Sequence, residues 1–88
     1  MRYLMAGTLI VMLGLPIIAA AEEYNGTCAY GLSEYGVVVE TDCKINWQDL
    51  KTGKTYCFSS EQSKESFLRA PEENIIKASE NFSKVGRQ

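Results

Sequence analysis

The pattern of hydrophobic and polar residues divides the chain into an apolar N-terminal run and a mixed remainder. Residues 3–18 are almost entirely apolar, follow the charged Arg2, and lead into the small residues Ala19 to Ala21. This order is typical of a secretory signal peptide. A retained membrane anchor is the alternative, because a run of about 18 apolar residues just spans a bilayer. We expect cleavage after Ala21, so residues 1–21 are the predicted signal peptide.

Residues 22–42 are expected to form an irregular lead-in and then a first strand. The lead-in runs to about Ser33 and contains Cys28. The run YGVVVE at residues 35–40 has the density of β-branched residues that is typical of a strand.

A strictly alternating run predicts the first strand of a β-hairpin. Residues 43–48 (CKINWQ) place Cys43, Ile45 and Trp47 on one face and polar side chains on the other. This is the pattern of a half-buried strand. Residues 49–53 contain turn formers and end in glycine, so the chain is expected to reverse there.

Residues 54–58 (KTYCF) form the predicted return strand of this hairpin. Alternation places Tyr56 and Phe58 on one face and Cys57 on the other. Together with Trp47, these rings form an aromatic face. Aromatic side chains in so small a domain belong more often to the core than to a ligand site.

The sequence after residue 58 changes to a helical period. Ser59 is a candidate N-cap, and Gln62 follows three residues later, as in a capping box. Pro71 suits the first turn of a second helix, where its missing N–H costs nothing. The apolar stripe of this second helix consists of Ile75, Ala78, Phe82 and Val85, and Gly86 is a plausible stop.

These elements predict an α+β fold, in which a small antiparallel β-hairpin or sheet is covered by two C-terminal helices, after an N-terminal signal peptide. The expected organisation is a signal peptide at 1–21, a lead-in and first strand at 22–42, and a folded domain at 43–88. A domain of this size buries only about 60% of its unfolded surface, so it usually needs a staple, meaning a disulfide or a bound metal that cross-links the chain.

Composition excludes several classes of function. The chain has no histidine, so it has no Ser-His-Asp or Cys-His arrangement and lacks the usual general base near neutral pH. We therefore expect no enzymatic activity. The formal net charge is −2, and no basic run recommends nucleic acid as a partner.

The run GKTYCFSSEQSKESFLRAPEENI resembles the YHS domain, a small module related to the TRASH metal-binding domains. The signature of that family is a Gly-Lys hairpin turn, an aromatic strand, a helix and then a Pro-started helix. The resemblance covers about residues 43–76, so residues 43–88 are expected to be a YHS-like domain. It rests on Gly53, Lys54, Tyr56, Phe58, Ser60, Glu61, Lys64, Phe67, Leu68, Pro71 and Glu72.

The resemblance implies metal handling, but the positions of the family's ligands carry serine. In metal-binding members the strand ends in a cysteine and a second follows four residues later on the helix, and these positions are Ser59 and Ser63 here. Serine hydroxyls are neutral at physiological pH and do not replace thiolates for a soft metal. A relocated site would use Cys57, two residues before Ser59.

The chain has three cysteines, an odd number, and export would place them in an oxidising compartment. In one interpretation Cys28, Cys43 and Cys57 surround one ion, and three thiolates suit monovalent copper. Zinc would need a fourth ligand. In the other interpretation two of the three form a structural disulfide and one thiol is left over. Inert free thiols are a third alternative.

Two hypotheses about function follow. The first is an exported YHS-like module that binds or relays a soft metal ion, copper before others, through Cys28, Cys43 and Cys57. The second is a disulfide-stapled interaction or accessory subunit that docks on a larger complex through its aromatic sheet face. The expected partner is thus a metal ion or a protein, and we expect no binding to nucleic acid. Contact with a membrane is expected only through residues 1–21, if these are retained. The expected location is a bacterial periplasm or the extracellular space.

Overall fold

The computed structural model describes residues 22–86, and the predicted signal peptide at residues 1–21 lies outside them. The elements in chain order are η2 (Glu23–Gly26), η3 (Gly31–Tyr35), β1 (Ile45–Gln48), β2 (Thr55–Phe58), α1 (Glu61–Phe67) and α2 (Pro71–Val85). The two strands form an antiparallel sheet, and two helices follow it. The predicted α+β class is confirmed. No helix within the described residues is long and apolar enough to cross a membrane.

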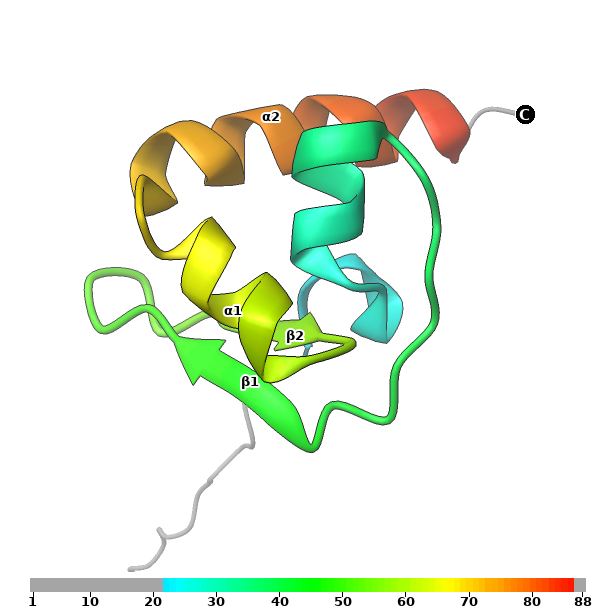
Figure 1. Ribbon diagram of the computed structural model, residues 1–88. Coiled ribbons are helices and arrows are strands. Elements are labelled where there is room, and N and C mark those ends of the chain that lie inside the picture. The colour runs from blue at the N-terminus through cyan, green and yellow to red at the C-terminus, as the bar shows by residue number, and fades with distance from the viewer. Residues whose placement is uncertain (1–21, 87–88) are drawn as a thin grey trace, which may run out of the picture.

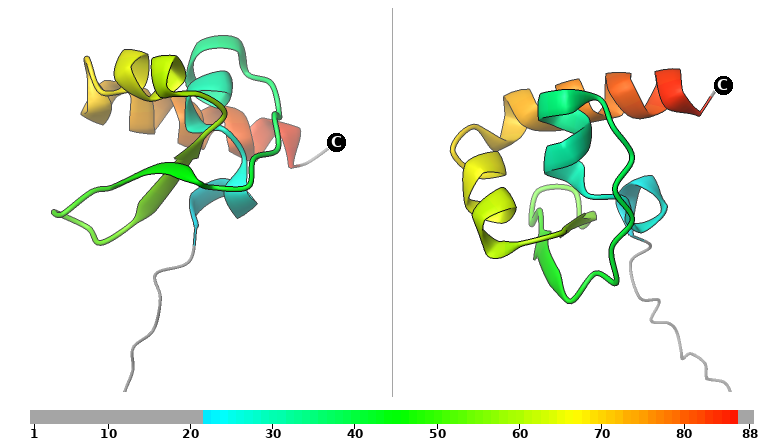
Figure 2. Two further views of the ribbon diagram at one scale, coloured as in Figure 1. Left: turned by 60° about the horizontal axis from the view of Figure 1, so that its bottom comes forward. Right: turned by 45° about the vertical axis from the view of Figure 1, so that its right-hand side comes forward.

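The longest helix and the hairpin occupy opposite sides of the molecule, with the shorter helices between them (Figure 1, Figure 2). Helix α2 packs against η3, while α1 lies against both strands. The buried core between these layers consists of Tyr24, Cys28, Ala29, Leu32, Tyr56, Phe58, Phe67 and Ala78. Half of these residues precede the hairpin, so the segment before residue 43 is part of the same core.

The predicted hairpin is present, with strands shorter than expected at their starts. Trp47 pairs with Tyr56 and Ile45 pairs with Phe58. The turn closes through a hydrogen bond from the Gly53 N–H to the carbonyl of residue 49, at 2.7 Å, and Gly53 has a φ of 77° that favours glycine. The prediction that Cys43 begins the strand is wrong, because its φ of 61° bends the chain before β1.

The aromatic side chains of the hairpin belong to the core. The rings of Tyr56 and Trp47 stack with centroids 5.7 Å apart, and Phe58 meets Phe67 edge to face at 5.2 Å. Burial raises the pKa of Tyr56 to about 12. Tyr56 and Phe58 are almost fully covered, whereas Trp47 is only partly buried, so the three rings do not form an open aromatic face. Cys57, on the opposite face, is also buried.

The lead-in is helical, which corrects the prediction of an irregular segment. In η2, Tyr24 and Asn25 have φ values of 59° and 57°, and Gly26 follows with 80°, so this turn is left-handed. Right-handed helical turns then run from residue 29 into η3. They end at Gly36, whose left-handed backbone (φ 65°) lets its N–H donate to the Leu32 carbonyl at 3.0 Å.

The strand predicted at residues 35–40 is absent. Tyr35 ends η3, and the residues after Gly36 are extended but join no sheet among the described residues. An isolated bridge pairs Glu40 with Thr27. The β-branched run therefore has no second strand beside it among the described residues, and its valine side chains are about half exposed.

The two C-terminal helices agree with the prediction except at one cap. Ser60, rather than Ser59, is the N-cap of α1, and its hydroxyl accepts a hydrogen bond from the Ser63 N–H at 3.0 Å. Pro71 occupies the first turn of α2, as expected, and Gly86 is the C-cap. The stripe of α2 faces the core through buried Ala78 and the packed side chains of Ile75, Phe82 and Val85.

Candidate functional site

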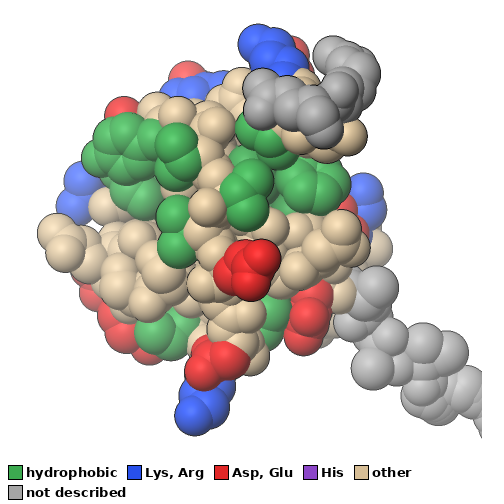
Figure 3. Space-filling model, turned by 90° about the vertical axis from the view of Figure 1, so that its right-hand side faces the viewer, with side chains coloured by type: hydrophobic (Ala, Val, Ile, Leu, Met, Phe, Trp, Pro, Cys, Tyr) green, Lys and Arg blue, Asp and Glu red, His purple; other side chains and the backbone are tan. Residues whose placement is uncertain are grey.

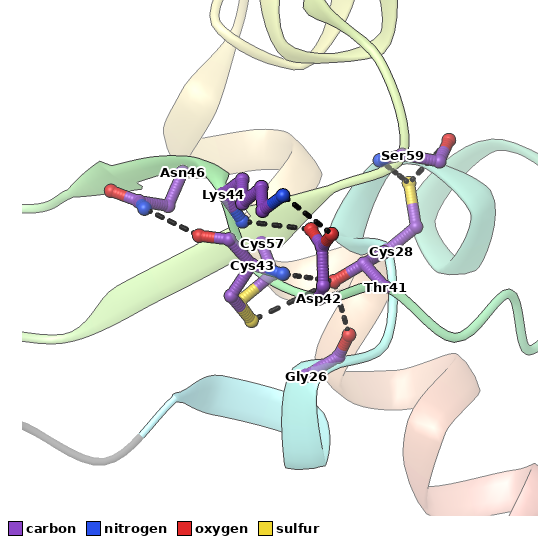
Figure 4. The surroundings of a disulfide bond; sticks show 9 residues. All are labelled: Gly26, Cys28, Thr41, Asp42, Cys43, Lys44, Asn46, Cys57 and Ser59. Atoms are coloured by element: carbon purple, nitrogen blue, oxygen red, sulfur yellow. Dashed lines mark hydrogen bonds and ion pairs between the residues drawn. A yellow bond between two sulfur atoms is a disulfide. The ribbon is translucent and has the colours of Figure 1, made fainter.

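Two of the three cysteines are joined. Cys43, at the bend before β1, forms a disulfide with Cys57 in β2, with their Cα atoms 4.8 Å apart (Figure 4). The bend is shaped by side chains just before it. Thr41 Oγ1 accepts the Cys43 N–H at 3.1 Å, and Asp42 Oδ1 accepts the Lys44 N–H at 3.0 Å. The interpretation that two cysteines form a staple therefore matches the structure.

Cys28 lies apart from the disulfide. Its backbone bridges to Cys57, but its sulfur turns toward the start of α1, where it accepts hydrogen bonds from the Ser59 N–H at 3.4 Å and the Ser59 hydroxyl at 3.6 Å (Figure 4). The Cys28 side chain is 2% exposed. The structure thus brings Cys43 and Cys57 together and leaves Cys28 as a buried free thiol.

The carboxylate of Glu22 lies beside the disulfide. Glu22, Cys43 and Cys57 each offer a ligand atom, and these atoms lie within 4.8 Å of one another. Glu22 reaches this position because its backbone bridges in parallel to Thr55 at the start of β2. While the two sulfurs are bonded to each other they are not thiolates, so the group as it stands lacks the sulfur ligands that a metal ion would need.

Ser59 and Ser63 both make hydrogen bonds within the fold. The Ser63 hydroxyl accepts a hydrogen bond from the Ser60 hydroxyl at 3.1 Å, and Ser59 contacts the Cys28 sulfur. Ser59, Ser63 and Cys28 also line a hollow of about 350 Å³, whose far wall includes Val37 and Val39. Its lining contains one buried thiol and no carboxylate, so it offers poor chemistry for a metal.

The residues on either side of Gly36 form an exposed apolar edge. Tyr35 is 68% exposed, and Val37, Val38 and Val39 are 45%, 50% and 39% exposed. We call these four residues the apolar edge. Figure 3 views the side of the molecule along which this segment runs, and hydrophobic side chains gather there beside acidic ones.

The backbone of the apolar edge is held on one side only. The Val39 carbonyl accepts the Cys28 N–H at 2.7 Å, and the Val37 N–H donates to the Gly31 carbonyl at 3.2 Å. Just beyond, the Thr41 N–H donates to the Gly26 carbonyl at 3.2 Å. Within the described residues, the N–H and carbonyl of Val38 make no backbone hydrogen bond. The segment therefore presents a free strand edge.

A second hollow, of about 340 Å³, lies between Trp47 and the start of α2. Its rim carries an ion pair in which Lys51 Nζ lies 2.6 Å from Glu72 Oε2. This contact lowers the pKa of Glu72 and raises that of Lys51. Both side chains are exposed, so the pair contributes little to stability.

Comparisons with protein-family models, with curated proteins and with solved structures found no match. The proposal of a function therefore rests on the geometry of this chain.

Sequence reasoning missed Glu22 as a neighbour of the disulfide, because Glu22 comes close to Cys43 through the bridge to Thr55. It found the run of valines but predicted a strand there, and the described residues form none at these positions. The acidic residues Glu34 and Glu40 on either side were the signal of a solvent-facing segment.

Proposed function

We propose that the chain is an exported, non-enzymatic interaction module whose disulfide-stapled core displays a strand edge for a partner protein. The observation that carries this proposal is the apolar edge, three exposed valines in extended backbone with unpaired hydrogen-bonding groups at Val38. An edge of this kind is a template for β-strand addition by another chain. This replaces the aromatic face as the docking surface, since Tyr56 and Phe58 are buried and Trp47 is partly buried.

The chemistry of the edge defines the partner. Main-chain hydrogen bonds at Val38 would give affinity, while the valine side chains favour alternating apolar residues in the added strand. Glu34 and Glu40 flank the valines, so basic residues at the ends of the partner segment are favoured. The occupant we propose is an extended apolar segment of a different protein, flanked by lysine or arginine.

A second copy of the chain is the less favoured occupant. Both flanks of the edge are acidic and the formal net charge of the chain is −2. Pairing two identical edges therefore brings like charges together, which costs stability. A basic-flanked partner has no such penalty.

A photo-crosslinking residue at position 38, in protein expressed in its export compartment, tests the proposal. We expect one specific adduct from position 38 and none from position 50, where Leu50 is 89% exposed and serves as the matched control. The adduct partner, once purified, should bind the Val38→Pro variant at least about tenfold more weakly, because proline removes the N–H donor. Val38→Thr retains the N–H and the branched shape, and should lose less.

Equal crosslinking from positions 38 and 50 would contradict the proposal. So would an adduct between two copies of the chain, which would make the edge a dimer interface. Val38→Pro should leave folding intact, because the Val38 N–H has no backbone partner within the described residues. A matching near-ultraviolet circular dichroism spectrum would confirm this.

The soft-metal hypothesis differs from this proposal in thiol state. Copper binding through Cys28, Cys43 and Cys57 needs three reduced sulfurs, whereas the stapled module has one free thiol. Mass spectrometry of the purified protein, native and then denatured with a thiol-alkylating reagent, separates the two. We expect one alkylated cysteine and no copper. Three alkylated cysteines together with an added copper mass would favour the YHS-like metal relay.

A further inference from the structure

We propose that reduction of the Cys43–Cys57 disulfide converts Glu22, Cys43 and Cys57 into a binding site for a zinc-like divalent cation. This inference goes beyond the interaction module proposed above and involves a different group of side chains, at the bend before β1. It differs from the three-cysteine copper site in its ligands, since a carboxylate takes the place of Cys28. The donor set is two thiolates and one carboxylate.

The distances fit such a site after a small movement. In a tetrahedral zinc site, with metal–ligand bonds of about 2.0–2.3 Å, neighbouring ligand atoms lie about 3.5–3.8 Å apart. The three ligand atoms already lie within 4.8 Å of one another. Two sulfurs that lose their bond must move apart toward their van der Waals contact distance, which is close to this spacing. Reduction by itself therefore brings the ligands toward the geometry of the ion.

The backbone leaves room for the ion. Gly26 faces the group, and a Cβ built on it would lie 3.5 Å from Cys43 Sγ and 3.6 Å from Glu22 Oε1. The missing side chain thus keeps open a space that both ligands border. The Thr41 carbonyl oxygen lies 3.9 Å from the same point. This oxygen or a water supplies the fourth ligand that zinc requires.

The chemistry balances with an external dithiol as the reductant. The dithiol passes two electrons and two protons to the Cys43–Cys57 bond, which gives two thiols while the reagent closes into its own disulfide. A divalent ion then displaces the two thiol protons, forming two metal–sulfur bonds. The Glu22 carboxylate adds the third bond to the ion.

The position of Cys28 argues against a three-thiolate site. Its sulfur is turned toward the start of α1 and is held by two hydrogen bonds from Ser59. Reaching the disulfide would require both to break and the buried side chain to turn. With two sulfurs and one oxygen, the available donors suit borderline Zn²⁺ better than Cu⁺, which prefers sulfur alone.

Titration of the purified protein with Zn²⁺, with and without prior reduction by a phosphine, tests this site. We expect one Zn²⁺ per reduced chain and none per oxidised chain, measured by competition with a coloured chelator. Glu22→Gln should weaken Zn²⁺ binding at least about tenfold, since even outer-shell partners of a metal have effects of that size. Glu23→Gln, which removes the adjacent carboxylate, and Cys28→Ser should bind as the wild type does.

Cadmium provides a second readout that does not depend on affinity. Cd²⁺ added to the reduced protein should give an ultraviolet thiolate-to-metal charge-transfer band, which Cys43→Ser reduces. Zn²⁺ should also raise the midpoint of thermal unfolding of the reduced protein, because it binds only the folded site. This holds even if the reduced, metal-free chain is largely unfolded, since metal binding and folding are then coupled.

Three results would overturn the proposal. Equal Zn²⁺ binding by the oxidised protein would place the ion elsewhere. Unchanged affinity in Glu22→Gln would remove the carboxylate from the site. A loss in Cys28→Ser as large as that in Cys43→Ser would restore the three-cysteine arrangement.

Discussion

Reducing the Cys43–Cys57 disulfide is expected to lower the free energy of unfolding by about 3 kcal/mol in metal-free solution. The bridge spans a sequence separation of 14 residues, and closing a loop of this length restricts the unfolded chain by about that amount. A domain of this size has a total stability of only about 3–10 kcal/mol. Urea unfolding, followed by the fluorescence of Trp47 stacked on Tyr56, measures the loss.

The Cys43→Ser variant separates the staple from side effects of the reductant. It should unfold at the same urea concentration as the reduced wild type, and adding reductant to it should change nothing further. Coincident unfolding curves for oxidised and reduced wild type would show that the bridge contributes no stability. Cys43 is a better site for this variant than Cys57, because Cys57 is fully buried and its replacement would also disturb the core.

The staple has a large effect because the sheet is small. Each strand has four residues, and an isolated two-stranded hairpin is at best marginally stable in water. The bridge fixes the start of β1 to β2, and it also fixes Thr41, whose N–H holds the end of the extended segment to Gly26. Under the proposals made above, the redox state of one bond would govern both the apolar edge and the metal ligands.

The parts of the fold that were predictable from sequence are those specified locally. The stripe of α2 and the proline at its start indicate a helix whatever lies beside it, and both were confirmed. The hairpin itself was indicated by strict alternation and by the turn residues that end in Gly53. The cap of α1 was displaced by one residue because Ser59 and Ser60 are equally good N-caps in sequence, and the contact between Ser59 and Cys28 decides between them.

The parts that were not predictable depend on contacts distant in sequence. The run Val37–Val39 has the propensity of a strand, but propensity does not supply a neighbouring strand, and the core leaves none beside it. Likewise Glu22 joins the cysteines through pairing with Thr55, on a strand more than thirty residues away in the chain. The sequence also left undetermined which two cysteines form the disulfide, since three cysteines allow three pairings.

The helical turns before Gly36 left a weak signal in the sequence. Cys28, Ala29 and Leu32 are apolar at spacings of three and four residues, and a glycine follows as a C-terminal stop. Gly31 and the polar residues Ser33 and Glu34 obscure this pattern. The buried side of these turns packs on α2, and the Leu32 carbonyl also accepts a hydrogen bond from the Asn81 amide at 2.7 Å. The segment before the hairpin is therefore a structural layer rather than a lead-in.

The Leu32→Ala variant tests whether the segment before the hairpin is a structural layer. We expect it to lower the free energy of unfolding by about 2–5 kcal/mol, because it removes a fully buried side chain and leaves a cavity beneath α2. Leu50→Ala is the matched control, because Leu50 is 89% exposed in the hairpin turn and its truncation should change stability by less than about 0.5 kcal/mol. Both are measured by urea unfolding of the oxidised protein. Similar unfolding midpoints for the two variants would mean that residues before the hairpin are dispensable. A large loss in Leu32→Ala alone would show that the domain extends well before Cys43, and that the apolar edge is attached to a rigid core.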